Sequence, residues 1–346
     1  ERGLAVGART ATFWTAEERC PAELGPAAPR VGERVAFPEL ARTLRAIADS
    51  GAAAVYRGPI ARAIAEASWL DEDDLARYRP RWVEPLRGGY RGATVLELPP
   101  PTQGVAALEA LGLLELGPPD LPSQVECVSL ALADGLARVR DGADVRGLLD
   151  SGYVARRRAE RASAPPLPVA GDTAYLCVVD SDRFAVSLIT SLYGLFGSGV
   201  VAPGTGIVLQ NRGACFVVEG RVAPGRRPYH TIIPGLLLRD GRLLGAFGVV
   251  GGFLQAQAHV QIVSALVDDG LDPQAALDRP RFRLERERVR LEEGLWEGEP
   301  ELSERGWRVS CDESGVDFGA GQAILCEGDA LVGGSDSRAD GLVGIA

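Results

Sequence analysis

The first half of the chain has apolar residues at the spacing of amphipathic helices. Leu40, Leu44 and Ile47 share one helical face. Pro38 suits the first turn of this helix, and Gly51 suits the position just past its end. The same spacing predicts further helices around residues 60–64, 105–111 and 128–139. We expect these apolar faces to form a core, with no role in binding a ligand.

Shorter apolar runs bounded by Gly and Pro predict strands. One run, residues 94–98, stops at three consecutive prolines, which cannot donate ladder hydrogen bonds. The other predicted strands follow later in the chain, over residues 174–180, 184–192, 206–210 and 243–250. An apolar helix is predicted over 254–267, and Asp272 caps a short helix that Pro280 stops. Two sheets layered between helices, an α+β arrangement, suit this order of elements.

Residues 155–172 change character and predict an exposed linker. An arginine-rich stretch gives way to one rich in Pro and Ala, which ends at Thr173. A threonine hydroxyl is a poor nucleophile without a base, and a free α-amine on the same residue supplies one because its pKa is roughly 8. Cleavage before Thr173 would create nucleophile and base together. The alternative is a threonine that only begins a strand.

Composition limits the classes of function. The 346 residues have a formal charge of −10, so nucleic acid and anionic membranes are poor partners. No apolar run approaches the roughly 20 residues of a membrane span. Six cysteines without a C-x-x-C pair and only two histidines predict buried thiols, no metal site and no cofactor. The chain does not begin with Met, so we expect a preceding segment, and a cytoplasmic location is an expectation only.

Several motifs in a fixed order carry a resemblance to a known family. They include Gly171-Asp172-Thr173-Ala174-Tyr175, Asn211-Arg212-Gly213, Pro228-Tyr229-His230-Thr231, Gly251-Gly252 and Asp272-Pro273-Gln274. Upstream, residues 99–104 (PPPTQG) continue the series. In this order the motifs resemble the γ-glutamyltransferase family, whose members are self-cleaving N-terminal-nucleophile (Ntn) hydrolases.

The resemblance implies a fold and a division of the chain. The fold would be the four-layer αββα Ntn-hydrolase sandwich, with a helical portion from the large subunit. Residues 1–172 would be the C-terminal part of the large (α) subunit, and residues 173–346 the small (β) catalytic subunit beginning at the nucleophile. The two fragments would stay interlocked as a heterodimer, and a higher oligomer is left open.

The resemblance also assigns catalytic roles. Thr173 would attack the carbonyl of Asp172 first and an external acyl group afterwards. Ser191 stands where family members often have a threonine that hydrogen-bonds the nucleophile, although it could equally be an ordinary strand serine. Gly251 and Gly252 precede the 254–267 helix, where backbone N–H groups suit an oxyanion hole. A tight turn would need the same two glycines.

Departures from the family pattern predict the substrate class. The acidic residue that holds a γ-glutamyl ammonium, four residues after the position of Asn211, is replaced here by Cys215. An asparagine that assists the same ammonium is replaced by Tyr193, and a Ser-Ser pair by His230-Thr231. An ammonium without its carboxylate partner is costly in a closed pocket. The Arg, His and Tyr side chains that remain suit a carboxylate or planar polar acyl group without an ammonium; they are Arg212, Arg226, Arg227, His230 and Tyr193.

The leading interpretation is therefore a self-processing N-terminal-threonine acyl hydrolase acting on a small non-glutamyl amide or acyl substrate, in secondary metabolism or elsewhere. C–C bond hydrolysis in a biosynthetic pathway, classical γ-glutamyl hydrolase or transpeptidase activity, and a dead relic that only binds remain alternatives. A cysteine hydrolase using Cys215 and His230 is discarded, because nothing in the sequence places the two together.

Overall fold

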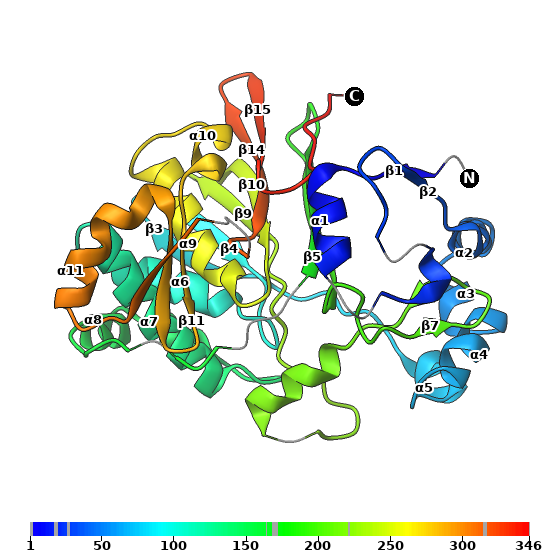
Figure 1. The fold of residues 1–346 in the computed structure, drawn as a ribbon. Helices are drawn as coiled ribbons and strands as arrows, with labels where there is room; N and C mark the ends of the chain where they lie inside the picture. The colour runs from blue at the N-terminus through cyan, green and yellow to red at the C-terminus, as the bar shows by residue number, and fades with distance from the viewer. Residues whose placement is uncertain are drawn as a thin grey trace. The chain divides into compact units, whose positions relative to one another are not determined.

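The computed structural model describes residues 3–16, 20–25, 28–163, 165–167, 172–220, 222–313 and 317–345 (Figure 1). The chain forms two compact units, and each is described by itself. Unit 1 comprises Glu1–Trp82 and Leu192–Arg212, and unit 2 comprises Val83–Ser191 and Gly213–Ala346. These units do not follow the predicted subunit division at residue 173, which concerns cleavage and stays a prediction.

Unit 1 is built from short helices and two small antiparallel strand pairs, β1–β2 and β7–β8. Its elements are β1 (Leu4–Ala5), α1 (Ala8–Ala16), η1 (Ala22–Leu24), β2 (Arg34–Val35), α2 (Pro38–Ser50), α3 (Ala53–Tyr56), α4 (Pro59–Glu66), α5 (Glu72–Arg77), β7 (Val201–Ala202) and β8 (Ile207–Val208). The predicted helices at 38–51 and 60–64 are confirmed as α2 and α4.

Two expectations for unit 1 were wrong in detail. On α2, Leu44 is 57% exposed and Thr43 is the buried residue. The Thr43 hydroxyl donates to the Thr205 carbonyl at 2.8 Å, which lets a polar residue face inward. The predicted strand 206–210 is reduced to the two residues of β8, because the backbone of Leu209 bonds to the adjoining loop at Ser198 and Val200 instead.

Unit 2 contains a six-stranded antiparallel sheet in the order β15-β14-β10-β9-β4-β3. Its elements up to residue 219 are β3 (Leu86–Tyr90), β4 (Ala93–Glu97), α6 (Gly104–Leu114), α7 (Leu121–Arg138), η2 (Arg146–Leu149), α8 (Ser151–Arg158), β5 (Asp172–Val179), β6 (Ala185–Tyr193) and η3 (Arg212–Glu219). β6 and η3 cross the boundary with unit 1.

The rest of unit 2 completes the sheet and adds a second, three-stranded sheet in the order β11-β12-β13. The elements are β9 (Gly235–Arg239), β10 (Arg242–Val250), α9 (Leu254–Val267), α10 (Pro273–Asp278), β11 (Phe282–Glu285), β12 (Arg288–Glu292), η4 (Glu293–Gly298), α11 (Glu299–Glu304), β13 (Val309–Asp312), β14 (Ala320–Glu327) and β15 (Ala330–Ser335). The predicted helix 254–267 is confirmed as α9, and Asp272 caps α10 by accepting from the Ala275 N–H at 2.9 Å.

The central strand β10 defines the layers of unit 2. Its neighbouring residues Phe247 and Gly248 point to opposite faces of the sheet. Phe247 contacts His259 of α9, with ring centroids 4.7 Å apart. Gly248 meets Tyr175 of β5, where an added Cβ would lie 2.4 Å from the ring. The helix α9, the six-stranded sheet and the β5–β6 pair therefore form three successive layers. This α–β–β order of layers is the one expected within the sandwich.

The predicted linker over 155–172 was partly wrong. Its first residues, up to Arg158, belong to α8. Arg157 of this helix is held by Asp134 of α7, with Nε and Oδ2 2.8 Å apart. Leu167 is buried, so the segment is packed at that point as well. The part nearest Thr173, residues 168–171, lies outside the described residues.

Candidate active site

Thr173 lies near the start of β5 and is half-buried. Tyr175, two residues on, shares its face of the strand. The Tyr175 ring packs against Gly248, and its hydroxyl makes a 2.8 Å hydrogen bond with Ser187 of β6. Burial raises the pKa of Tyr175, so this hydroxyl keeps its proton. These contacts fix the strand that carries Thr173 against the sheet below it.

Gly251 and Gly252 form the turn between β10 and α9. Their φ angles are +127° and +62°, a region that favours glycine. The two carbonyls accept hydrogen bonds from the N–H groups of Leu254 and Gln255, each at 3.1 Å. The turn therefore leads directly into the N-terminal end of α9, where the helix dipole favours negative charge.

Gln255, in the first turn of α9, connects this region to Thr173. Its side chain is fully buried. The carboxamide Nε2 lies 3.5 Å from Thr173 Oγ1, and Oε1 accepts from the backbone N–H of Ile233 at 3.1 Å. One neutral side chain thus joins the Thr173 hydroxyl to the loop that carries His230 and Thr231.

Gln103 makes a second connection of the same kind. Its buried Nε2 donates to the carbonyls of Thr231 at 2.7 Å and Gly252 at 3.0 Å. The backbone N–H of Gln103 also donates to the His230 carbonyl at 2.9 Å, while the His230 N–H donates to Pro101 at 2.8 Å. The 99–104 segment therefore ties the 230–231 loop to the glycine turn.

Of the residues predicted from sequence, this arrangement brings together Thr173, Gly252, His230 and Thr231. Gly251 adjoins them in the same turn. Ser191 lies on β6, the neighbour of β5, in a half-buried position. The roles of these residues stay predictions.

Cys215 lies in η3 and is 1% exposed. Burial and the nearby Cys215 together raise the pKa of Tyr229, so the thiol lies close to that phenol. A thiol so thoroughly buried is a poor candidate for an accessible nucleophile, which agrees with discarding the cysteine-hydrolase hypothesis.

The other predicted substrate-binding residues belong to unit 1. Tyr193 has a φ of +77°, uncommon for an aromatic residue. The guanidinium of Arg212 lies over its ring, 4.8 Å from the centroid. Asn211 accepts from the Gly194 N–H through Oδ1 at 2.8 Å and donates its own N–H to Leu192 at 3.0 Å. Tyr193, Asn211 and Arg212 are thus organised together within unit 1.

A buried acid–base pair lies between the sheet and α9. Glu97 Oε1 and His259 Nδ1 are 2.6 Å apart, and both side chains are fully buried. Burial raises the pKa of Glu97, whereas the imidazole opposes the shift. The pair joins β4 to the helix that carries Gln255.

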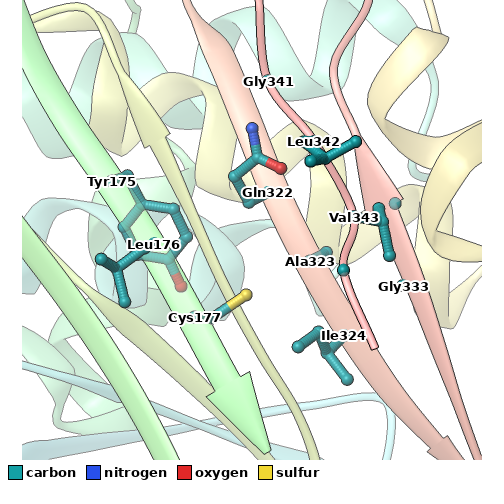
Figure 2. A pocket seen from close by; sticks show the side chains of 12 residues that line it. Tyr175, Leu176, Cys177, Gln322, Ala323, Ile324, Gly333, Gly341, Leu342 and Val343 are labelled. Carbon is teal, nitrogen blue, oxygen red and sulfur yellow. The ribbon is translucent and has the colours of Figure 1, made fainter. Parts of the chain in front are cut away.

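A cavity of about 210 Å³ lies elsewhere, between β5, β14, β15 and the C-terminal segment (Figure 2). Tyr175, Cys177 and Gln322 are among its lining residues. Burial raises the pKa of Cys177 to about 11, so the thiol is protonated at neutral pH. None of the candidate site residues lines this cavity, and we do not assign it to the site.

No group of three or more His, Cys, Asp or Glu side chains within the described part of the chain could hold a metal ion. No helix among the same residues has the length and apolar character needed to cross a bilayer.

Sequence reasoning missed Gln103 and Gln255 as site residues. The available signal was a polar side chain inside an apolar stretch: Gln255, Gln257 and Gln261 all lie on the helix predicted as apolar. Buried polar groups need partners, so each such residue points to a specific contact. The sequence could not tell which of the three contacts Thr173.

The family described as gamma-glutamyltranspeptidase matches residues 21–346. An oxamate amidohydrolase proenzyme of Klebsiella pneumoniae is 36% identical over 285 residues, covering 75% of this chain and 54% of the relative. A glutathione hydrolase-like YwrD proenzyme of Bacillus subtilis is 35% identical over 284 residues, covering 74% and 54%. The chain thus spans about half the length of these curated relatives.

Among solved structures, the cephalosporin acylase from Bacillus halodurans has a similar fold. The TM-score is 0.89 with 37% sequence identity, covering 99% of this chain and 71% of the acylase chain. This likeness extends over both compact units, and it confirms the α+β Ntn-hydrolase fold expected from sequence.

Proposed function

Because the chain belongs to the γ-glutamyltranspeptidase family, we propose that it is the catalytic part of a self-processing N-terminal-threonine hydrolase. Its substrate class would be small amides or related acyl compounds without a γ-glutamyl group. The observation that carries the proposal is the position of Thr173, with its hydroxyl facing the Gln255 carboxamide at the start of α9.

Self-processing comes first in this proposal. Thr173 Oγ attacks the carbonyl carbon of Asp172, the C–N bond breaks, and the nitrogen takes the hydroxyl proton to become a free α-amine. Water then hydrolyses the ester, leaving a carboxylate on Asp172 and restoring the hydroxyl. The fragments 1–172 and 173–346 would remain together as a heterodimer. The proenzyme names of the relatives support this step.

Turnover repeats the same chemistry on an external amide. The α-amine of Thr173 accepts the hydroxyl proton while Oγ forms a bond to the acyl carbon, and that proton passes to the departing nitrogen. Water then releases the acid from the ester. The oxyanion formed in each step would be stabilised by N–H groups at the Gly251-Gly252 turn, where one donor typically accounts for roughly 10²–10³ in rate.

The substrate class rests on the residues that differ from the γ-glutamyl pattern. Cys215 has a thiol where the γ-glutamyl pattern has an aspartate, so it supplies no fixed carboxylate charge for an ammonium. Two relatives point the same way, since one is named an oxamate amidohydrolase and the other a cephalosporin acylase. A substrate with a carboxylate or planar polar acyl group would suit His230, which replaces the first serine of the family's Ser-Ser pair.

Mass spectrometry and an amide panel test the proposal. The intact mass of the denatured natural gene product should show a fragment that begins at Thr173, and Thr173→Ala should remain uncut. Ammonia release from oxamate and other small amides should then be measured beside p-nitroaniline release from γ-glutamyl-p-nitroanilide. An active but uncut protein would refute the mechanism, and efficient γ-glutamyl turnover would refute the substrate class.

A further inference from the structure

The orientation of the Gln255 carboxamide is set by its surroundings. The backbone N–H of Ile233 can only donate, so the Gln255 atom that faces it at 3.1 Å must be the oxygen. The NH2 group is therefore the end that faces Thr173 Oγ1, 3.5 Å away. Since an NH2 group can only donate, Thr173 Oγ1 is the acceptor in this contact.

We propose that Gln255 is a catalytic residue, donating a hydrogen bond to Thr173 Oγ1 while that oxygen attacks the acyl carbon, while it is bonded to that carbon and when it is expelled from it. The inference rests on the proposed function, because it needs Thr173 as the nucleophile. The present separation is long for a hydrogen bond, and such contacts tighten as the reaction proceeds.

The contact acts in two ways. Because the Gln255 NH2 group cannot accept, the hydroxyl proton must pass to another acceptor. During turnover this acceptor is the free α-amine of Thr173, and during self-processing it is the same nitrogen as its bond to the Asp172 carbonyl carbon breaks. When water hydrolyses the ester, the bond between Oγ1 and the acyl carbon breaks and the electron pair returns to Oγ1. A donor at that oxygen stabilises the developing negative charge until a proton arrives. The N-terminal end of α9 adds its positive potential at the same place.

The other buried glutamine of α9 shows that this role is specific to position 255. Gln257 is equally buried, but its carboxamide binds the backbone of Phe253 and Leu284. It holds the helix to β11 and makes no contact with Thr173 among the hydrogen bonds of the described residues. Gln257 is therefore a matched structural control.

Two substitutions separate the donor from the rest of the side chain. Gln255→Met fills a similar volume and removes both hydrogen bonds. Gln255→Glu keeps an oxygen for the Ile233 N–H, but as a carboxylate it has no donor for Thr173. When protonated, the same carboxyl regains a donor, and burial raises its pKa toward neutrality.

The experiment measures scission before Thr173 in the full natural gene product, which requires no substrate. Fresh precursor from cell-free synthesis is followed by intact mass between about pH 5.5 and pH 8. Gln255→Met should be cut roughly tenfold to a hundredfold more slowly at every pH, the loss expected for one hydrogen bond to an oxygen that develops charge. Gln255→Glu should be equally slow near pH 8, and its rate relative to wild type should rise about tenfold by pH 5.5. Gln257→Glu should show no such recovery.

The rates of scission separate a failure of this inference from a failure of the proposed function. If wild type and Thr173→Ala are both uncut, the proposed function fails and the inference fails with it. If wild type is cut, Thr173→Ala is not, and the Gln255 variants match wild type, only the inference fails. A Gln255→Glu rate that stays in a fixed ratio to wild type at all pH values, or exceeds it near pH 8, also overturns the donor role.

Discussion

Glu109 is a buried acid in the core of unit 2, and its environment ties stability to pH. It lies on α6 with 0% exposure. Burial raises the pKa of Glu109 to about 10, and the neighbouring Asp134 adds to the shift, whereas Arg157 and Arg138 oppose it. Glu109 is therefore protonated and neutral in the folded protein at pH 7.

Proton counting gives the sign and size of the effect. The unfolded chain loses this proton near pH 4.5, and the folded chain keeps it until about pH 10. The bound proton stabilises the fold fully below pH 4.5. That stabilisation falls by about 1.4 kcal/mol for each pH unit as the pH rises toward 10. At pH 7, which is 2.5 units above 4.5, the loss is about 3.4 kcal/mol.

Glu109→Gln replaces the acid with a neutral group of the same shape, which should not suffer this loss. We expect the unfolding free energy of the variant minus that of wild type to grow by about 3.4 kcal/mol between pH 5.5 and pH 8. Urea unfolding at both pH values measures it. Glu304→Gln, an exposed position on α11 with the same charge change, is the control. An unchanged difference would refute the reasoning.

Three further predictions follow from the geometry. Gly252→Ala should reduce the rates of scission and turnover by roughly 10²-fold. Gly270 has nearly the same positive φ, +63°, and no atom would crowd an added Cβ there, so Gly270→Ala should cost stability only. Equal activities for the two variants would contradict the oxyanion assignment. Arg281→Leu should lower the free energy of unfolding by about 3–5 kcal/mol, because it leaves buried Asp336 without its Arg281 partner. Arg279→Leu breaks an exposed pair with Asp269 and should cost under about 1 kcal/mol. Similar costs for the two variants in urea unfolding would contradict this reasoning. Iodoacetamide should label Cys311 in the native protein and Cys127 and Cys215 only after unfolding, because the last two are buried; peptide mass mapping that found native Cys215 labelled would disprove its burial.

Much of the fold could be predicted where one residue pattern dominates the local structure. The helix 254–267 has the bounds expected from its apolar run, and Asp272 caps the next helix as expected. β3 could not be predicted, because Arg87, Gly88 and Gly89 have little strand propensity. Its pairing with β4 and the close packing of Gly88 against Leu108 stabilise it instead. Such long-range contacts are not visible in a local pattern.

The residues of the candidate site could likewise be predicted from the sequence only in part. Thr173 and the two glycines could be named because they lie in motifs that resemble the family pattern. Their predicted roles depend on backbone chemistry, namely a new amino terminus and backbone N–H groups at a glycine turn. Gln103 and Gln255 act through side chains that reach across more than 80 residues of sequence, so only the fold brings them to the site.

Neutral carboxamides are well suited to this position for a physical reason. A buried charge near Thr173 would need its own partner and would titrate or shift with pH. A glutamine satisfies a loop N–H with its oxygen and offers a donor with its nitrogen, and it carries no charge at any pH. Gln103 and Gln255 both bind loop backbone in this way, so removing either side chain disturbs folding as well as chemistry. Loss of activity after truncation alone would therefore not identify a catalytic role. Only a variant that keeps the backbone contact and changes the donor, such as Gln255→Glu, separates the two contributions.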